Sequence, residues 1–223
     1  MFLEMQPKLI FTEETLGLKQ KEGQTDDIAR DFTIRVDCIL KNHSGSGVKK
    51  LKLAVFDRYN VTTCHLNSWL EKAIVPGIEE VTILLPTKYR VGYNFPCGRV
   101  NTPIVADKFI HLKYLMIYLT YGDEKCVSPS YDYLSLASFL NASPVLETSI
   151  PSVDQEEMKH DPAFGDASPN RQISEHKHDR LKKLQINGFC SAKSMVELTC
   201  HILENATSLE SVTLDTGHGI RCV

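Results

Sequence analysis

The chain has 223 residues, with 25 Lys and Arg against 28 Asp and Glu, and 42% of its residues are hydrophobic. This composition is typical of a globular chain long enough to bury a full hydrophobic core. A formal net charge of −3 argues against a nucleic-acid-binding protein held by bulk charge. No apolar stretch approaches the roughly 18 residues of a membrane-spanning helix. Composition alone assigns no activity.

One pattern, apolar-x-x-apolar-x-apolar, recurs along the chain. Its copies are Val48–Leu53, Ile78–Ile83, Leu112–Ile117, Val145–Ile150, Leu181–Ile186 and Leu209–Leu214, the fourth being degraded at Thr148. Successive copies begin 30, 34, 33, 36 and 28 residues apart. A near-constant step of this kind is the signature of a repeat architecture.

Helical stripes lie between the copies and are listed here in chain order. They are Phe32, Val36, Ile39 and Leu40; Leu66, Leu70, Ala73 and Ile74; Tyr133, Leu136, Phe139 and Leu140; and Met195, Leu198, Ile202 and Leu203. Ser191 or Ser194 is a candidate N-cap for the last helix. Cys38, Cys64 and Cys200 fall within helical patterns, so we expect buried free thiols there.

Each copy of the pattern alternates along its length, so one face of the strand is apolar and the other polar. Leu51 and Leu53 share one face, while Lys50 and Lys52 share the other. The sequence therefore predicts an α/β leucine-rich-repeat solenoid, a partial horseshoe of helix-turn-strand units with a parallel sheet. A doubly wound α/β fold is the alternative, because it also alternates strands and helices.

Two segments interrupt the repeat. Segment 86–108 carries several prolines and glycines and predicts an irregular connector. Segment 152–179 is poor in apolar residues and rich in acids, which predicts an exposed loop. Both segments belong to a repeat domain that we expect at 29–223, and residues 1–28 form a lead-in to it.

Several segments resemble plant F-box/LRR proteins of the FBD-like group. Leu181–Glu210 is similar to the C-terminal end of that family, Trp69–Ile74 and Ile78–Pro86 to an early repeat, and Ser143–Glu147 to a recurrent step. The likeness runs from about Leu9 to Val223. It implies a repeat solenoid that recruits a protein substrate to a cullin ubiquitin ligase through a Skp-type adaptor.

The sequence departs from that family in two ways. Pro7–Thr12 resembles the stretch that follows an F-box, but the F-box itself is missing. The family also usually has more repeats between the second and third copies seen here. The resemblance therefore implies a shortened member, without the element that binds the Skp-type adaptor.

Candidate chemistry is sparse, and we assign no catalytic, cofactor-binding or metal-ligating residue. His160, His176 and His178 lie among acids, but their spacing lacks helical i, i+4 geometry and no cysteine joins them. Cys200 and His201 are neighbours that point in different directions on a helix. The Gly45–Gly47 stretch precedes a strand, which is the wrong order for a phosphate-binding loop.

The polar face of the strands is the candidate protein-binding surface. Its expected residues are Lys50, Lys52, Glu80, Thr82, Tyr114, Met116, Glu147, Ser149, Lys183, Gln185, Ser211 and Thr213. Charges alternate along this set, which disfavours nucleic acid. Tyr114, Met116 and Tyr118 form the best contact patch, because Tyr and Met are enriched at protein interfaces. The alternative is that these residues pack against the neighbouring long connector.

We therefore expect a non-enzymatic interaction module for an unidentified protein, without nucleic-acid or membrane partners and without a cofactor. The segment near Met1 lacks the apolar run of a secretory signal, and the seven cysteines show no paired spacing. The expected location is intracellular, in the cytoplasm, the nucleus or both. The alternatives are a doubly wound α/β enzyme with an unrecognised site, or a truncated product without independent function.

Overall fold

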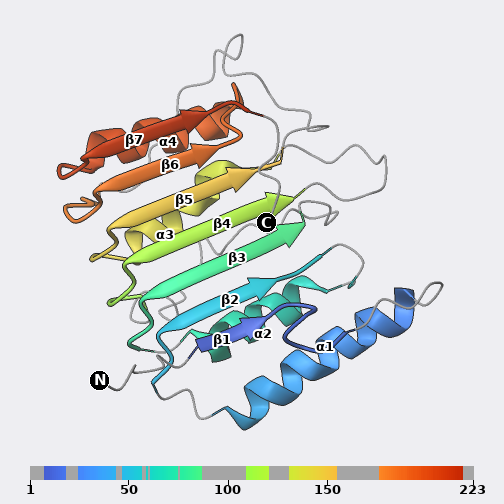
Figure 1. Ribbon diagram of the computed structural model, residues 1–223. Helices are drawn as coiled ribbons and strands as arrows, with labels where there is room; N and C mark the ends of the chain where they lie inside the picture. Colours follow the sequence, from blue (N-terminus) through green and yellow to red (C-terminus); the bar gives the residue numbers. More distant parts are fainter. Residues whose placement is uncertain are drawn as a thin grey trace.

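The computed structural model describes residues 8–18, 25–43, 47–56, 59, 61–74, 76–86, 109–120, 131–154 and 176–217. Within these residues, seven parallel strands form one sheet whose spatial order follows the chain (Figure 1). They are β1 (Lys8–Phe11), β2 (Lys50–Ala54), β3 (Glu80–Pro86), β4 (Tyr114–Thr120), β5 (Thr148–Val153), β6 (Lys183–Asn187) and β7 (Ser211–Asp215). The repeat pattern did not predict β1, which extends the sheet into the lead-in.

The described helices are α1 (Thr25–Asn42), α2 (Thr63–Ala73), the 3-10 turn η2 (Tyr133–Leu136), α3 (Ala137–Asn141) and α4 (Lys193–Asn205). Helices α2, α3 and α4 lie on one side of the sheet, and the other side carries none of them (Figure 1). A doubly wound fold would reverse its strand order and place helices on both faces. The predicted leucine-rich-repeat solenoid is therefore confirmed.

The buried stripes of α1 and α4 are narrower than predicted. Phe32, Val36 and Leu40 are buried as expected on α1, but Ile39 is 40% exposed. Leu203 on α4 is likewise 48% exposed. Ile39 and Leu203 are each next in sequence to a buried residue, and adjacent residues on a helix point about 100° apart. Such a residue is buried only where the contact surface of the helix is wide enough to include both directions.

The prediction of a serine N-cap for α4 is wrong. The cap residue is Ala192, which makes no side-chain capping bond. The Ser194 hydroxyl instead donates to the Tyr131 carbonyl and accepts from the Tyr133 amide, both at 3.2 Å. It links α4 to the 3-10 turn η2.

The N-terminal end of the core is an aromatic cluster that joins α1 to α2. Phe32 stacks on Tyr59 with ring centroids 4.1 Å apart and meets Trp69 edge-on at 5.9 Å. The indole Nε1 of Trp69 donates to Asp37 Oδ1 at 2.6 Å. The polar end of a buried indole is thus satisfied, as such a group requires.

A backbone ladder stacks successive repeats. The carbonyl of Lys49, just before β2, accepts the amides of Glu79 and Glu80 at 2.9 and 3.0 Å. The carbonyls that precede β3 to β6 repeat this double acceptance towards the next strand. Gly77 makes the turn into β3 with φ of 104°, a left-handed conformation that glycine adopts without strain.

The fourth repeat begins at Leu146, one residue later than predicted. Leu112 and Leu181 are each two residues before their strands, and Leu146 holds that place before β5. Ser149 and Pro151 therefore occupy the inward positions, where β4 carries Leu115 and Ile117. Because a serine and a proline stand where apolar residues are expected, the pattern placed the fourth repeat one residue too early.

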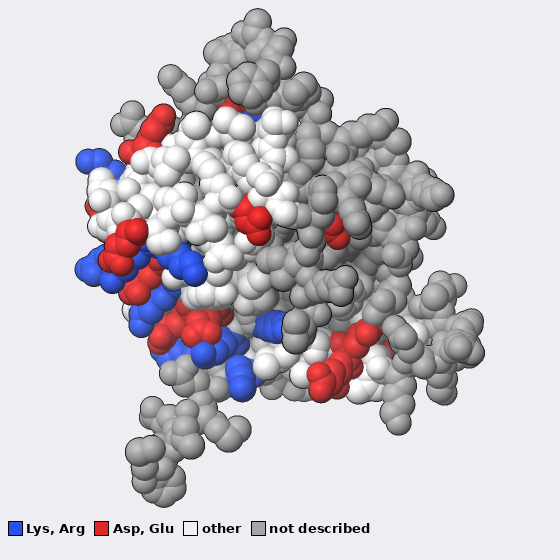
Figure 2. Space-filling model, turned by 45° about the horizontal axis from the view of Figure 1, so that its top comes forward, with Lys and Arg blue, Asp and Glu red and all other residues white. Residues whose placement is uncertain are grey.

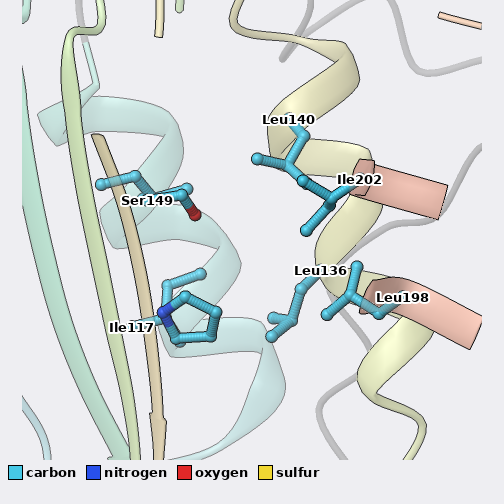
Figure 3. Close-up of a pocket in the computed structure, with 8 residues that line it drawn as sticks. Ile117, Leu136, Leu140, Ser149, Leu198 and Ile202 are labelled. Carbon is cyan, nitrogen blue, oxygen red and sulfur yellow. The ribbon is translucent and has the colours of Figure 1, made fainter. Parts of the chain in front are cut away.

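These two small side chains leave a cavity of about 10 Å³ between the sheet and the helices. Figure 3 shows Ile117 and Ser149 on the sheet side facing helical leucines and an isoleucine. The helical lining residues are Leu136, Leu140, Leu198 and Ile202. Pro151 also interrupts the ladder to β6, where Ile150 and Pro151 have no paired residue, because proline lacks an amide hydrogen.

Filling this cavity is expected to stabilise the fold. In Ser149→Val, two methyl groups replace a buried hydroxyl, and we expect the free energy of unfolding to rise by about 1 kcal/mol. Urea denaturation followed by circular dichroism measures the change. Ser211→Val, the same substitution at an exposed position of β7, is the control for β propensity. An equal gain in both variants would contradict the cavity explanation.

The structure describes only parts of the two segments that interrupt the repeat. Beyond Pro86, the predicted connector 86–108 lies outside the described residues, as does 155–175 of the predicted acidic loop. The ends of that loop differ from expectation, because Ser152 is buried within β5 and His178 is buried before β6. No helix among the described residues is long and apolar enough to cross a membrane.

Candidate protein-interaction surface

The open face of the sheet consists of alternate strand residues that point away from the helices. In the first row, Lys50, Glu80 and Tyr114 are neighbours in register. In the second row, Lys52, Thr82 and Met116 are neighbours in register. These six side chains are partly or fully exposed, whereas the residues between them are buried. The open face is therefore accessible to solvent at the amino-terminal ends of β2, β3 and β4.

The predicted surface residues fall into three groups. Those placed on the open face with accessible surface are Lys50, Lys52, Glu80, Thr82, Tyr114, Met116, Lys183, Gln185, Ser211 and Thr213. Tyr118 lies on this face but is only 8% exposed, so it adds little to a contact patch. Ser149 is buried on the helix side, and Glu147 precedes β5, so the prediction for these two is wrong.

The one-residue shift in the fourth repeat explains this correction. Because side chains alternate along a strand, a shift by one residue moves every side chain to the opposite face. Thr148 and Ile150 are thus the open-face residues of β5, next to Tyr114 and Met116 on β4. Sequence reasoning missed Ile150, and starting the fourth copy at Leu146 would have found it.

Tyr114, Met116 and Ile150 form a patch at the middle of the open face, which we call the apolar patch. All three side chains are partly exposed. The Tyr114 hydroxyl lies 3.8 Å from the Met116 sulfur. Partial burial raises the pKa of Tyr114, and the charge of neighbouring Glu80 adds to the effect. The phenol is therefore a neutral hydrogen-bond donor at physiological pH.

A second feature lies at the amino ends of the strands. The residues that precede β2 to β7 alternate in charge, and we call them the charge ladder: Lys49, Glu79, Lys113, Glu147, Lys182 and Glu210. Lys49 and Lys113 both contact the Glu79 carboxylate, at 2.7 and 3.2 Å. Their hydrogen bonds, first that of Lys49, lower the pKa of Glu79.

On the open face itself, Lys50 pairs with Glu80 at 2.7 Å. Figure 2 shows basic and acidic side chains intermingled along one side of the molecule. Such exposed pairs each contribute about 0–1 kcal/mol to stability. They mainly fix which charges remain available to a partner.

Two histidines are buried away from this surface, near the C-terminal end of the sheet. The rings of His178 and His201 meet edge-on with centroids 5.7 Å apart, and neither buried Nε2 atom has a hydrogen-bond partner. Burial lowers the pKa of His178 to about 4, and proximity to His201 adds to the effect. Burial also lowers the pKa of His201.

Other sequence-based candidates are placed as follows. Among the described residues, no group of three or more His, Cys, Asp or Glu side chains has metal-binding geometry. His160 lies outside the described residues, and His176 is exposed. Cys38, Cys64 and Cys200 are exposed rather than buried, so that prediction is wrong. Each lies on the solvent side of a helix whose opposite side packs on the core.

Comparison with known proteins agrees with this architecture. No curated protein and no solved structure matches the chain. The family model described as At1g61320/AtMIF1, LRR domain, matches residues 39–99 and 98–223. Those two matches cover most of the chain and all but the first of the strands described above. The chain therefore belongs to the At1g61320/AtMIF1 LRR domain family.

Proposed function

We propose that this chain is a non-enzymatic module that binds a protein partner on the open face of its sheet. The observation that carries the proposal is the apolar patch, Tyr114, Met116 and Ile150, which lies partly exposed on the face opposite α2, α3 and α4. Tyrosine and methionine at the centre of a patch, surrounded by polar residues, are typical of protein interfaces. A sheet of seven strands offers a broad, rigid surface to such a partner.

A finer proposal follows from the resemblance to F-box/LRR proteins. We infer that the partner is a substrate protein which the repeats present for ubiquitination, inside the cell, in the cytoplasm or nucleus. The similarity of Leu181–Glu210 and Ile78–Pro86 to that family supports the inference. The resemblance covers the stretch that follows an F-box and not an F-box itself, so the proposal assigns contact with a Skp-type adaptor to no part of this sequence.

The double variant Tyr114→Ala/Met116→Ala tests the proposal. It removes two of the three patch side chains from a solvent-facing position, so we expect at least a tenfold loss of partner capture with little change in stability. Immobilised protein would be incubated with a cell extract, and retained proteins would be quantified by mass spectrometry. Urea denaturation would show that the variant is folded.

The matched control is Ile34→Ala/Ile39→Ala on α1, which removes two exposed apolar side chains from a helix. Proteins that wild type and control retain equally, and the patch variant loses, are partners of the open face. If the patch variant and the wild type retain the same proteins in the same amounts, the proposed surface is wrong.

A further inference from the structure

The open face carries a charge opposite to that of the whole chain. Among the described strand residues of this face, the basic ones are Lys8, Lys50, Lys52 and Lys183, and the acidic ones are Glu80 and Asp215. The described strands therefore give this face a net positive charge, although the chain has a formal net charge of −3. The corrected register of the fourth repeat matters here, because it removes Glu147 from this face.

The basic charge is available at two places that flank the apolar patch. Lys50 is occupied by Glu80, whereas Lys52 on β2 and Lys183 on β6 are exposed and form no ion pair with any described residue. Strands β2 and β6 lie on either side of β4, which carries Tyr114 and Met116. The accessible part of the open face thus has an apolar centre between two available ammonium groups.

The spacing of these groups suits a short stretch of extended polypeptide. Neighbouring strands are about 4.8 Å apart, so β2 and β6, four strands apart in the sheet, are separated by roughly 19 Å. An extended chain covers about 3.3 Å per residue, so about six residues span this distance. An apolar residue at the centre would reach Met116, and carboxylates about three residues away would reach Lys52 and Lys183.

The same features disfavour a nucleic acid as the ligand. Single-stranded nucleic acids are bound by aromatic side chains that stack on several bases, together with a continuous basic groove. Tyr114 is the one aromatic residue with accessible surface on the described open face, since Tyr118 is buried. Glu80 also lies between the lysines of β2 and the apolar patch.

We propose that the partner segment is an extended acidic peptide with an apolar anchor, which lies across the strands from Lys52 to Lys183 and places its anchor on Tyr114, Met116 and Ile150. This inference rests on the proposed function and specifies the chemistry of its partner. Electrostatic complementarity of this kind supplies specificity and speeds association, and its contribution weakens as salt is added.

A random 12-residue peptide library displayed on phage tests the inference without knowledge of the partner. We expect selection on the wild-type chain to enrich peptides with a central Leu, Met, Phe or Trp and with Asp or Glu on both sides. Enrichment of basic or uncharged peptides, or of no sequence at all, overturns the inference. Binding of fluorescein-labelled oligo(U) in preference to the selected peptides overturns it in favour of RNA.

Charge reversal then locates the contact. Fluorescence anisotropy of an enriched peptide should show at least tenfold weaker binding to Lys52→Glu/Lys183→Glu than to wild type. The control variant Lys41→Glu/Lys72→Glu makes the same change of charge at exposed positions on α1 and α2 and should bind normally. Equal losses in both variants would overturn the inference.

The two proposals fail in different ways. If Tyr114→Ala/Met116→Ala abolishes partner capture and Lys52→Glu/Lys183→Glu does not, the open face binds a partner whose contact is not acidic. If neither variant affects capture, the open face is not the binding surface, and both proposals fall.

Discussion

Acidification from pH 7 to pH 4 will destabilise the C-terminal repeats, because two neutral histidines are buried side by side. The pKa of His178 is lowered to about 4 from an ordinary value of 6.5, chiefly by burial. In the unfolded chain the same imidazole takes up its proton near its ordinary pKa. The unfolded state therefore binds more protons than the folded state between these two values, and it gains stability there.

The direction and size of the effect follow from this difference. The contribution of neutral His178 is fully present above about pH 6.5 and is lost as the pH falls to about 4. The pKa of His178 differs by about 2.5 units between the unfolded and folded states, which corresponds to about 3 kcal/mol in the free energy of unfolding. His201, whose pKa is also lowered, acts in the same direction.

The groups around the pair do not remove this effect. From the segment before β6, His176 lowers the pKa of His178 further, and Asp179 raises it in part. From α4, Glu204 raises the pKa of His201 in part. Since neither buried Nε2 atom has an acceptor, a protonated ring would leave a donor without a partner.

Urea denaturation at pH 7.5 and pH 4.5 measures the loss, and a double variant isolates its source. Carboxylates titrate in all forms of the protein, so the comparison is between the pH slopes. We expect His178→Gln/His201→Gln to lose markedly less stability on acidification than wild type. His111→Gln, at an exposed position, is the control. Equal slopes for all three proteins would mean that the buried pair does not govern acid sensitivity.

The repeat could be predicted from the sequence because its physical cause is local. A strand covered on one side alternates between apolar and polar residues, and this produces the pattern at Ile78–Ile83 or Leu181–Ile186. The pattern failed where the inward side chains are not apolar, as at Ser149 and Pro151 in β5. It also missed β1, where Leu9 and Phe11 alternate correctly but polar Gln6 stands at the first apolar position of the motif.

The sequence predicts which face of the sheet each surface side chain points to, but not how exposed that side chain is. Alternation placed Lys52, Thr82 and Met116 on the open face, and the structure agrees. Alternation cannot reveal that Tyr118 is buried, because burial there depends on what lies over the carboxyl half of β4. The buried histidine pair was missed for a similar reason. His178 and His201 are distant in sequence, and only the packing of α4 near the start of β6 brings their rings together.

Equivalent residues of the last two strands should contribute very differently to the free energy of unfolding. Ile186 on β6 and Leu214 on β7 are partners in register and point to the same side of the sheet. Ile186 is fully buried, whereas Leu214 is 43% exposed, because among the described residues no helix follows β7 to cover it. In a solenoid, a residue is stabilised mainly by the repeats on either side of it.

We therefore expect Ile186→Ala to lower the free energy of unfolding by about 3 kcal/mol, and Leu214→Ala by less than about 1 kcal/mol. Both substitutions shorten an aliphatic side chain to alanine in a five-residue strand. The higher strand propensity of Ile contributes less than about 1 kcal/mol to the difference between them. The midpoint of urea denaturation, monitored by circular dichroism, gives the two costs. Equal losses of unfolding free energy would mean that β7 is covered in solution by a surface outside the described residues. A larger loss for Leu214→Ala would contradict the view that each repeat is stabilised by its neighbours.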